Sequence, residues 1–147
     1  MATHELICAK LDTLIGYLQE LQEYTQDLTL AAYQGNRLTR RAVERTIQLI
    51  VECATDVNNM LIKSEGGKTP SDYFNSFVEL AELEVIPMEM ALDIGPSTGL
   101  RNVLVHEYVK IDDVRVYGSL GKIFKLYPKY VRLISNYAGC QQFTRNR

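Results

Sequence analysis

Two long stripes of apolar residues constrain the fold of this chain more than any other feature of its sequence. In both stripes the apolar residues recur at alternating spacings of three and four, which is the period of one face of an α-helix. Gly66 and Gly67 follow the second stripe and supply a stop signal for it. The stripes are Ile7, Leu11, Leu14, Leu18 and Leu21, and then Val43, Ile47, Ile50, Ala54, Val57 and Leu61. We therefore expect two long amphipathic helices.

Capping residues organise the first half of the chain around these stripes. Thr29 can cap a short helical turn that ends near Gly35, and Asn36 can then cap the long second helix. The Pro-Ser-Asp sequence at 70–72 is a start signal for a third helix, which should end near Glu84 or Val85. This third helix is expected to place four apolar residues inward, Phe74, Phe77, Leu80 and Leu83.

The second half begins with a short helical piece over residues 87–92, which the Gly-Pro pair at 95–96 interrupts. Ser97 or Thr98 can then cap a new helix that runs through Arg101 to Tyr108. The last helix follows Asp112 and Asp113 and carries the apolar stripe Val116, Leu120, Ile123, Tyr127, Tyr130 and Ile134. The two aspartates could hold magnesium, but adjacent carboxylates at a helix start favour capping.

The sequence shows no sustained alternation of apolar and polar residues, so nothing in it indicates a sheet. The pattern predicts an all-α, up-and-down helical bundle of about five helices. The chain has 147 residues, of which 46% are hydrophobic, and this is enough to bury one core. We expect a single domain over residues 1–147.

The charge balance limits how the chain could contact nucleic acid. With 16 basic and 18 acidic residues the formal charge is −2, so any RNA contact requires a local patch. One candidate patch is a helical ridge of arginines, Arg37, Arg40, Arg41 and Arg45. Glu44 and Glu52 lie on neighbouring turns and could instead pair with this ridge as an ordinary solvated face. The sequence leaves both interpretations open.

Cysteine usage and the amino terminus suggest where the chain acts. Cys8, Cys53 and Cys140 are an odd number, lie far apart and form no C-x-x-C pair, which argues against a disulfide framework or a zinc site. The Gly-Lys-Thr at 67–69 lacks the earlier glycine of a phosphate-binding loop, so we expect a helix–helix turn and no nucleotide cofactor. Without a signal peptide or an apolar run long enough for a membrane span, a cytoplasmic protein is expected.

Four residues within residues 101–108 could carry chemistry: Arg101, Asn102, His106 and Tyr108. Cleaving RNA without a metal requires an acid and a base, together with positive charge for the phosphoryl transition state. Histidine titrates near neutral pH, and arginine can grip two phosphate oxygens with its planar fork. On a continuous helix, Asn102 and His106 would lie about 40° apart, so Asn102 could orient the imidazole. Arg101 and Tyr108 would share a second face, within about 20° of each other.

Because these two faces diverge, one helix does not bring Arg101 and His106 side by side. A second copy of the helix across a two-fold axis would complete a composite cleft, which predicts a homodimer. From the residues alone, however, an ordinary structural interpretation is favoured. In that interpretation Arg101 pairs with a surface carboxylate, His106 is a polar core residue and Tyr108 packs its ring.

The pattern Arg101-x4-His106-x-Tyr108, with Asn102 after the arginine, resembles the signature of HepT-type HEPN toxins. Its surroundings are similar as well: Ala-Val-Glu-Arg at 42–45, Pro-Ser-Asp-Tyr at 70–73 and Ile-Asp at 111–112. The resemblance spans roughly residues 4 to 138. It implies a dimeric helical bundle that cleaves RNA, with His106 as acid or base, Arg101 as transition-state stabiliser and Asn102 as a polar helper.

The resemblance also implies a partner. In pairs of HepT and MntA, a nucleotidyltransferase antitoxin transfers AMP onto the tyrosine that matches Tyr108 and so silences the toxin. An adenylate there would add bulk and negative charge near Arg101, where an RNA phosphate must sit. The chain lacks the Gly-Ser and paired aspartates of the transferase itself, so this partner must be a separate protein. An alternative is a catalytically silent helical module that only binds a nucleotidyltransferase.

Overall fold

The computed structural model of the chain describes residues 2–106 and 110–141. Within these residues all regular elements are α-helices, which confirms the predicted fold class. The helices in chain order are α1 (Ala2–Thr25), α2 (Leu30–Gly35), α3 (Arg37–Ser64), α4 (Tyr73–Glu82), α5 (Met88–Ile94), α6 (Pro96–Val105) and α7 (Asp113–Ala138). Of these described helices, none is both long and apolar enough to cross a membrane.

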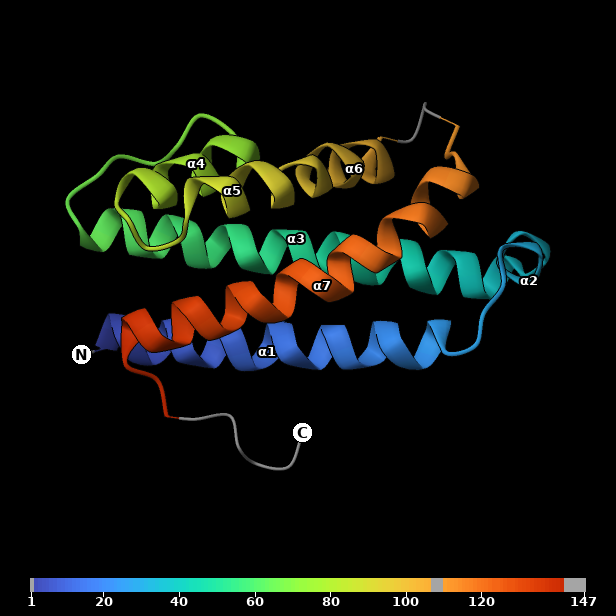
Figure 1. Ribbon diagram of the computed structural model, residues 1–147, viewed down its shortest axis with the longest axis horizontal. Coiled ribbons are helices and arrows are strands. Elements are labelled where there is room, and N and C mark those ends of the chain that lie inside the picture. Colours follow the sequence, from blue (N-terminus) through green and yellow to red (C-terminus); the bar gives the residue numbers. More distant parts are fainter. Residues whose placement is uncertain (1, 107–109, 142–147) are drawn as a thin grey trace.

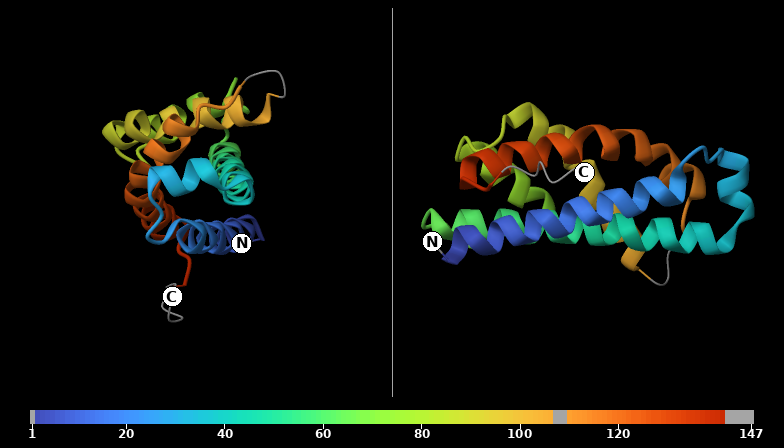
Figure 2. Two further views of the ribbon diagram at one scale, coloured as in Figure 1. Left: turned by 90° about the vertical axis from the view of Figure 1, so that its right-hand side faces the viewer. Right: turned by 90° about the horizontal axis from the view of Figure 1, so that it is seen from below.

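The long helices α1 and α3 run in opposite directions and form the most extensive helix pair of the bundle (Figure 1). The short helix α2 joins them at one end. Helix α7 returns along α1 toward the end where the chain begins, whereas α4, α5 and α6 lie along the other side of α3. Seen from the end, α1, α3, α6 and α7 surround a common interior (Figure 2). Helix α6 therefore rests on the middle of α3, away from α1.

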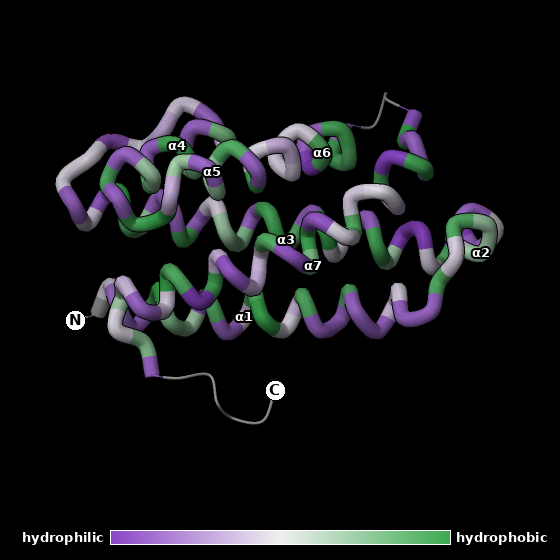
Figure 3. Tube along the Cα trace, viewed as in Figure 1, coloured by the Kyte–Doolittle hydropathy of each residue, from purple (hydrophilic) through white to green (hydrophobic). Residues whose placement is uncertain are grey.

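The apolar stripes form the core as predicted. Every residue of the two amino-terminal stripes is buried, with an exposed fraction of at most 8%. The stripe of α7 is buried as well, with at most 7% exposure. Polar and apolar segments alternate along α1 in Figure 3, as expected of an amphipathic helix. Each Å² of apolar surface that folding removes from water stabilises the folded state by about 25 cal/mol. Burial of these three stripes is therefore the main stabilising contribution to the bundle.

The predicted helix caps are confirmed at four positions. Side-chain oxygens of Thr29, Asn36 and Asp72 accept hydrogen bonds from backbone N–H groups three residues later, at 3.1, 3.0 and 2.8 Å. Asp112 accepts from the N–H groups of Val114 and Arg115 and so caps α7. These side chains fix the starts of α2, α3, α4 and α7 because they satisfy donors that have no partner within the helix.

The predicted inward face of α4 was only half right. Phe77 and Leu80 are fully buried, but Phe74 and Leu83 are 38% and 40% exposed. A spacing of three residues falls short of a full helical turn by about 60° at each step, so four such residues drift halfway round the helix. Only the two central residues of the series can face the core.

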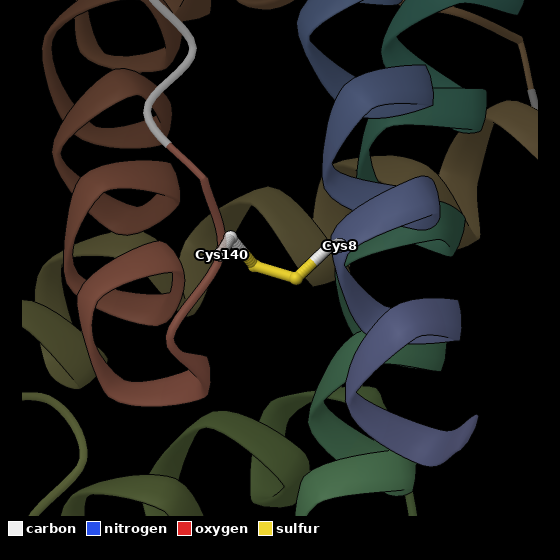
Figure 4. Close-up of a disulfide and its surroundings, with 2 residues drawn as sticks. All are labelled: Cys8 and Cys140. Carbon is white, nitrogen blue, oxygen red and sulfur yellow. A yellow bond between two sulfur atoms is a disulfide. The ribbon is translucent and has the colours of Figure 1, made fainter. Parts of the chain in front are cut away.

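The sequence argument against a disulfide was wrong. Cys8 at the start of α1 and Cys140 just beyond α7 form a disulfide, with Cα atoms 5.6 Å apart (Figure 4). The 132 residues between them hid this pairing, because only the folded bundle brings α1 and the end of α7 together. Cys53 remains free and buried, its thiol donates to the carbonyl of Lys10, and burial raises its pKa to about 11.

Candidate active site

The candidate segment lies on α6, whose start differs from the prediction. Gly95 adopts helical dihedral angles and Pro96 is the first residue of α6, so α5 and α6 are almost continuous. Neither Ser97 nor Thr98 acts as the predicted cap. Their hydroxyls instead donate back to the carbonyls of Ile94 and Gly95, both at 2.7 Å. Proline suits the first helical position because its fixed φ is already helical and it lacks an N–H that would be unsatisfied there.

Apolar packing and specific polar contacts hold α6 on the bundle. Leu100 is only 3% exposed and anchors the helix in the core. The Ser97 hydroxyl and the Tyr127 hydroxyl of α7 hydrogen-bond at 2.8 Å. At the α5–α6 junction, the ring of Phe74 lies so close to Gly95 that a Cβ there would sit 2.3 Å from the ring carbon Cε1. A side chain at position 95 would therefore force the Phe74 ring or the helix to move.

Arg101 points from α6 to α3, where it binds Glu52. Its Nη2 and Nε atoms donate to the Oε2 oxygen of Glu52 at 2.7 and 3.0 Å. The guanidinium carbon also lies 4.5 Å from the centre of the Tyr73 ring, at the start of α4. This distance is in the range of a favourable cation–π contact. Arg101 is thus held by an ion pair on one edge and by an aromatic ring on one face.

Glu52 is kept ionised by its neighbours. Burial is the largest single influence and raises the pKa of Glu52, but hydrogen bonds from Gln48 and Arg101 and the charges of Arg101 and Arg45 together lower it more. The net result is a pKa below the usual range of a glutamate. The side chains of Arg101 and Glu52 are 20% and 27% exposed, so this ion pair is less screened by solvent than a surface pair.

The predicted partnership of Asn102 and His106 was wrong, because α6 ends at Val105. His106 is the C-terminal cap of α6 with extended dihedral angles, φ −87° and ψ 114°. Its backbone N–H still bonds to the Val103 carbonyl, but its exposed side chain no longer follows the helical angle. The Asn102 side chain accepts instead from Arg101 Nη1 at 3.2 Å. The β-branched residues before His106 favour this early end, although the sequence has no glycine or proline stop there.

The predicted face shared by Arg101 and Tyr108 stays a prediction, because the described part of α6 ends at Val105. Tyr108 itself lies outside the described residues. Of the ordinary alternatives, the pairing of Arg101 with a carboxylate is confirmed. The alternative that His106 is a core residue is wrong, because it is exposed.

The arginine ridge on α3 is partly engaged in ion pairs. Arg41 Nη1 binds Glu44 at 3.2 Å, and Arg40 contacts Asp113 of α7 at 3.8 Å and the Gln34 carbonyl. The predicted pairing of Glu44 with the ridge is therefore confirmed, whereas Glu52 pairs with Arg101. The remaining members of the ridge, Arg37 and Arg45, are exposed.

Comparison with known proteins places this chain in a family. Residues 14–134, most of the chain, match the family model described as ribonuclease HepT-like. The chain belongs to the ribonuclease HepT-like family. The chain is 35% identical over 133 residues to the tRNA nuclease HepT of Aphanizomenon flos-aquae, covering 90% of this chain and 89% of that protein. It is 29% identical over 120 residues to a putative RNase of Archaeoglobus fulgidus, covering 80% and 90%.

Solved structures share the HepT-like fold of this chain. A toxin–antitoxin structure with AMP-PNP matches with a TM-score of 0.82 and 18% identity, covering 90% of this chain and 98% of that one. The tri-AMPylated HEPN toxin of Shewanella oneidensis, in complex with its MNT antitoxin, matches with a TM-score of 0.81 and 19% identity, covering 88% and 96%. At these identities the likeness concerns the fold.

Sequence reasoning missed two residues of the candidate site, Glu52 as the partner of Arg101 and Tyr73 as its stacking ring. Glu52 lies 49 residues before Arg101, so no local pattern joins them. Tyr73 directly follows the Asp72 cap, and the predicted start of α4 was a signal that could have placed it. Within the described part of this HepT-like chain, no three or more His, Cys, Asp or Glu side chains are grouped to hold a metal ion.

Proposed function

We propose that this chain is a toxin endoribonuclease that cleaves RNA without a metal ion. The observation that carries the proposal is the position of Arg101 and His106 in a HepT-like chain: a fixed guanidinium on the last turns of α6, and an exposed imidazole at its end. His106 acts as acid or base on the 2'-hydroxyl and the leaving oxygen. Arg101 stabilises the charge of the phosphoryl transition state, and Asn102 assists through its contact with Arg101. The tRNA nuclease relative supports an RNA substrate.

The cleft forms between two copies of the chain. Helix α6 directs Arg101 toward α3, while His106 lies beyond the end of the helix and is exposed. A two-fold related copy would bring a second arginine and histidine to the same phosphate, so that each protomer completes the site of the other. The exposed Arg37 and Arg45 then contact the RNA backbone or the antitoxin, with Arg40 and Arg41 beside them as ion-paired neighbours.

A nucleotidyltransferase antitoxin of the MntA kind neutralises the toxin by adding AMP to Tyr108. The similar toxin solved in tri-AMPylated form with an MNT antitoxin supports this regulation. Each adenylate adds negative charge two residues from His106, where it would compete with the RNA phosphate. The toxin cleaves RNA in the cytoplasm, where cellular reductants would act on the Cys8–Cys140 disulfide.

The catalytic proposal is tested with His106→Ala in an RNA cleavage assay that contains EDTA. Losing the acid–base group should lower kcat by roughly 10²- to 10⁴-fold. His4→Ala is the matched control, because it removes the only other histidine of the chain, and it should cleave at the wild-type rate. If His106→Ala cleaves as fast as the wild type, the mechanism is wrong. Antitoxin binding without any RNA cleavage by the wild type would favour the silent module instead.

The modification is tested by intact mass spectrometry of the chain co-expressed with its antitoxin. The wild type should carry one or more adenylates, and Tyr108→Phe should carry none. An unmodified wild-type chain in a stable complex with the antitoxin would contradict regulation by adenylylation.

A further inference from the structure

The guanidinium of Arg101 offers two hydrogen-bonding edges, and one of them is already occupied. Its side edge, formed by Nε and Nη2, binds the Oε2 oxygen of Glu52 at 3.0 and 2.7 Å. Apart from the bond of Nη2 to Glu52, the two nitrogens of its end edge, Nη1 and Nη2, have only the 3.2 Å contact of Nη1 with Asn102 among the described residues. Each terminal nitrogen carries two N–H groups, so both can still donate to a further acceptor.

We propose that Glu52 is a positioning residue for RNA cleavage, which holds the side edge of Arg101 so that its end edge faces the phosphate. This inference rests on the proposed ribonuclease function. A free arginine side chain samples many rotamers, and an arginine fixed before RNA binds loses less freedom in the transition state. Tyr73 completes the arrangement by covering one face of the guanidinium, at 4.5 Å from its carbon.

The support around Glu52 is itself fixed. Gln48, one turn earlier on α3, donates to the same Oε2 oxygen at 3.0 Å. This oxygen therefore accepts three hydrogen bonds, two from Arg101 and one from Gln48. Because Glu52 remains ionised with a lowered pKa, it binds the guanidinium through charge-assisted hydrogen bonds.

The opposite role for Glu52 makes an opposite prediction. If the ion pair with Glu52 withheld Arg101 from RNA, removing the carboxylate would free the arginine and raise activity. If Glu52 positions Arg101, removing the carboxylate lowers activity. The sign of the change in kcat therefore separates the two roles.

The experiment measures RNA cleavage by Glu52→Ala, Glu52→Gln and Arg101→Ala, and by the double variant Glu52→Ala/Arg101→Ala. We expect Glu52→Ala to lower kcat roughly 10- to 100-fold with a smaller change in KM, as for a misplaced catalytic group. Glu52→Gln should retain more activity, because its amide oxygen can accept the same hydrogen bonds. In the Arg101→Ala background, Glu52→Ala should cause no further loss, because the arginine that it positions is absent.

Asp56→Ala is the matched control, since it removes another carboxylate from α3, four residues further on. Asp56 pairs with Lys10 at the surface rather than with Arg101, so this variant should keep wild-type activity. Unfolding by urea checks that each variant is folded under the assay conditions. A loss of activity in Asp56→Ala as large as in Glu52→Ala would overturn the specific role of Glu52.

Two results distinguish the inference from the function on which it rests. If Arg101→Ala abolishes cleavage but Glu52→Ala equals or exceeds the wild type, the positioning role is wrong and the ribonuclease proposal stands. If cleavage by the wild type does not depend on Arg101 or His106, the proposed function fails. The geometry is also tested without RNA, by NMR of the Arg101 Nε–H group. Its exchange with solvent should be at least tenfold faster in Glu52→Ala, and an unchanged rate would overturn the inference.

Discussion

Helices α6 and α7 are neighbours in sequence, but they are held in the bundle in different ways. Ten residues of α7 are buried, and the disulfide from Cys8 to Cys140 ties its end to α1. Helix α6 buries only Thr98 and Leu100 and depends on directional contacts, including the Ser97–Tyr127 hydrogen bond and the Arg101–Glu52 ion pair. The scaffold therefore owes its stability to apolar burial and a cross-link, and the candidate site owes its geometry to a few polar atoms. Stability and activity should respond to different substitutions.

The largest expected effect is a loss of stability when the disulfide that ties α7 to α1 is removed. Cys140→Ser removes a cross-link that closes a loop of about 130 residues, and the chain-entropy model predicts a loss of up to about 5 kcal/mol in the free energy of unfolding. Urea unfolding with and without reductant measures this loss. Activity under native conditions should persist, because no contact of Arg101 involves the disulfide. Cys53→Ala is the control, since it keeps the disulfide and should remain sensitive to reductant.

A smaller effect tests the junction that places α6. In Gly95→Ala the new Cβ would lie 2.3 Å from the Phe74 ring, so the ring or the helix must move, at a cost of roughly 1–3 kcal/mol. Cleavage should fall as well, because α6 carries Arg101. In the control Gly99→Ala, four residues further along, the Cβ meets only Arg115 Nη2 at 3.8 Å. That variant should be unchanged or more stable by up to about 1 kcal/mol. Equal unfolding midpoints for both variants would show that Phe74 does not constrain the junction.

The smallest expected effect is on how the free energy of unfolding changes with pH. It compares Glu52 at the candidate site with Glu44, which lies eight residues earlier on α3 and belongs to the scaffold. Burial and the Asp113 charge raise the pKa of Glu44, against the influence of Arg41, whereas the pKa of Glu52 is lowered. The contribution of Glu44 to stability is thus full below pH 4.5 or so and is lost as the pH rises through its raised pKa. The contribution of Glu52 is present above that pH and is lost as the pH falls through its lowered pKa.

Urea unfolding of Glu44→Gln and Glu52→Gln between about pH 3 and pH 7 checks these opposite signs. As the pH rises, Glu52→Gln should become progressively less stable relative to the wild type. Over the same range Glu44→Gln should improve relative to the wild type. Parallel curves for the two variants would mean that the two glutamates have similar surroundings.

The sequence predicted the scaffold well because its signals are local. The stripes of α1, α3 and α7 and the caps at Thr29, Asn36 and Asp112 depend on residues within a few turns of one another. The disulfide escaped prediction because it joins opposite ends of the chain. The inward face of α4 was overestimated because three-residue spacing rotates around a helix, which left Phe74 outside the core.

The sequence could name the residues of the candidate site but could not predict how they are arranged. Arg101, Asn102 and His106 share a short motif, and a motif is visible in sequence. Their relative directions depend on where α6 ends, and no glycine or proline marks that end at His106. Glu52 comes from a different helix, so its contact with Arg101 is a tertiary interaction that only the packed bundle produces.

The disulfide also joins two residues that are 132 positions apart, so it closes most of the chain into one covalent loop. With the Cα atoms of Cys8 and Cys140 only 5.6 Å apart, the first part of α1 and the end of α7 lie at the same end of the bundle. A circular permutant could therefore join the two ends through a short peptide linker and open the chain at Gly66, in the turn between α3 and α4. Such a permutant would replace a bond that reductants break with a peptide bond that they do not. It would keep α4, α5 and α6 in their original order, whereas α3, which bears Glu52, would become the last helix of the chain.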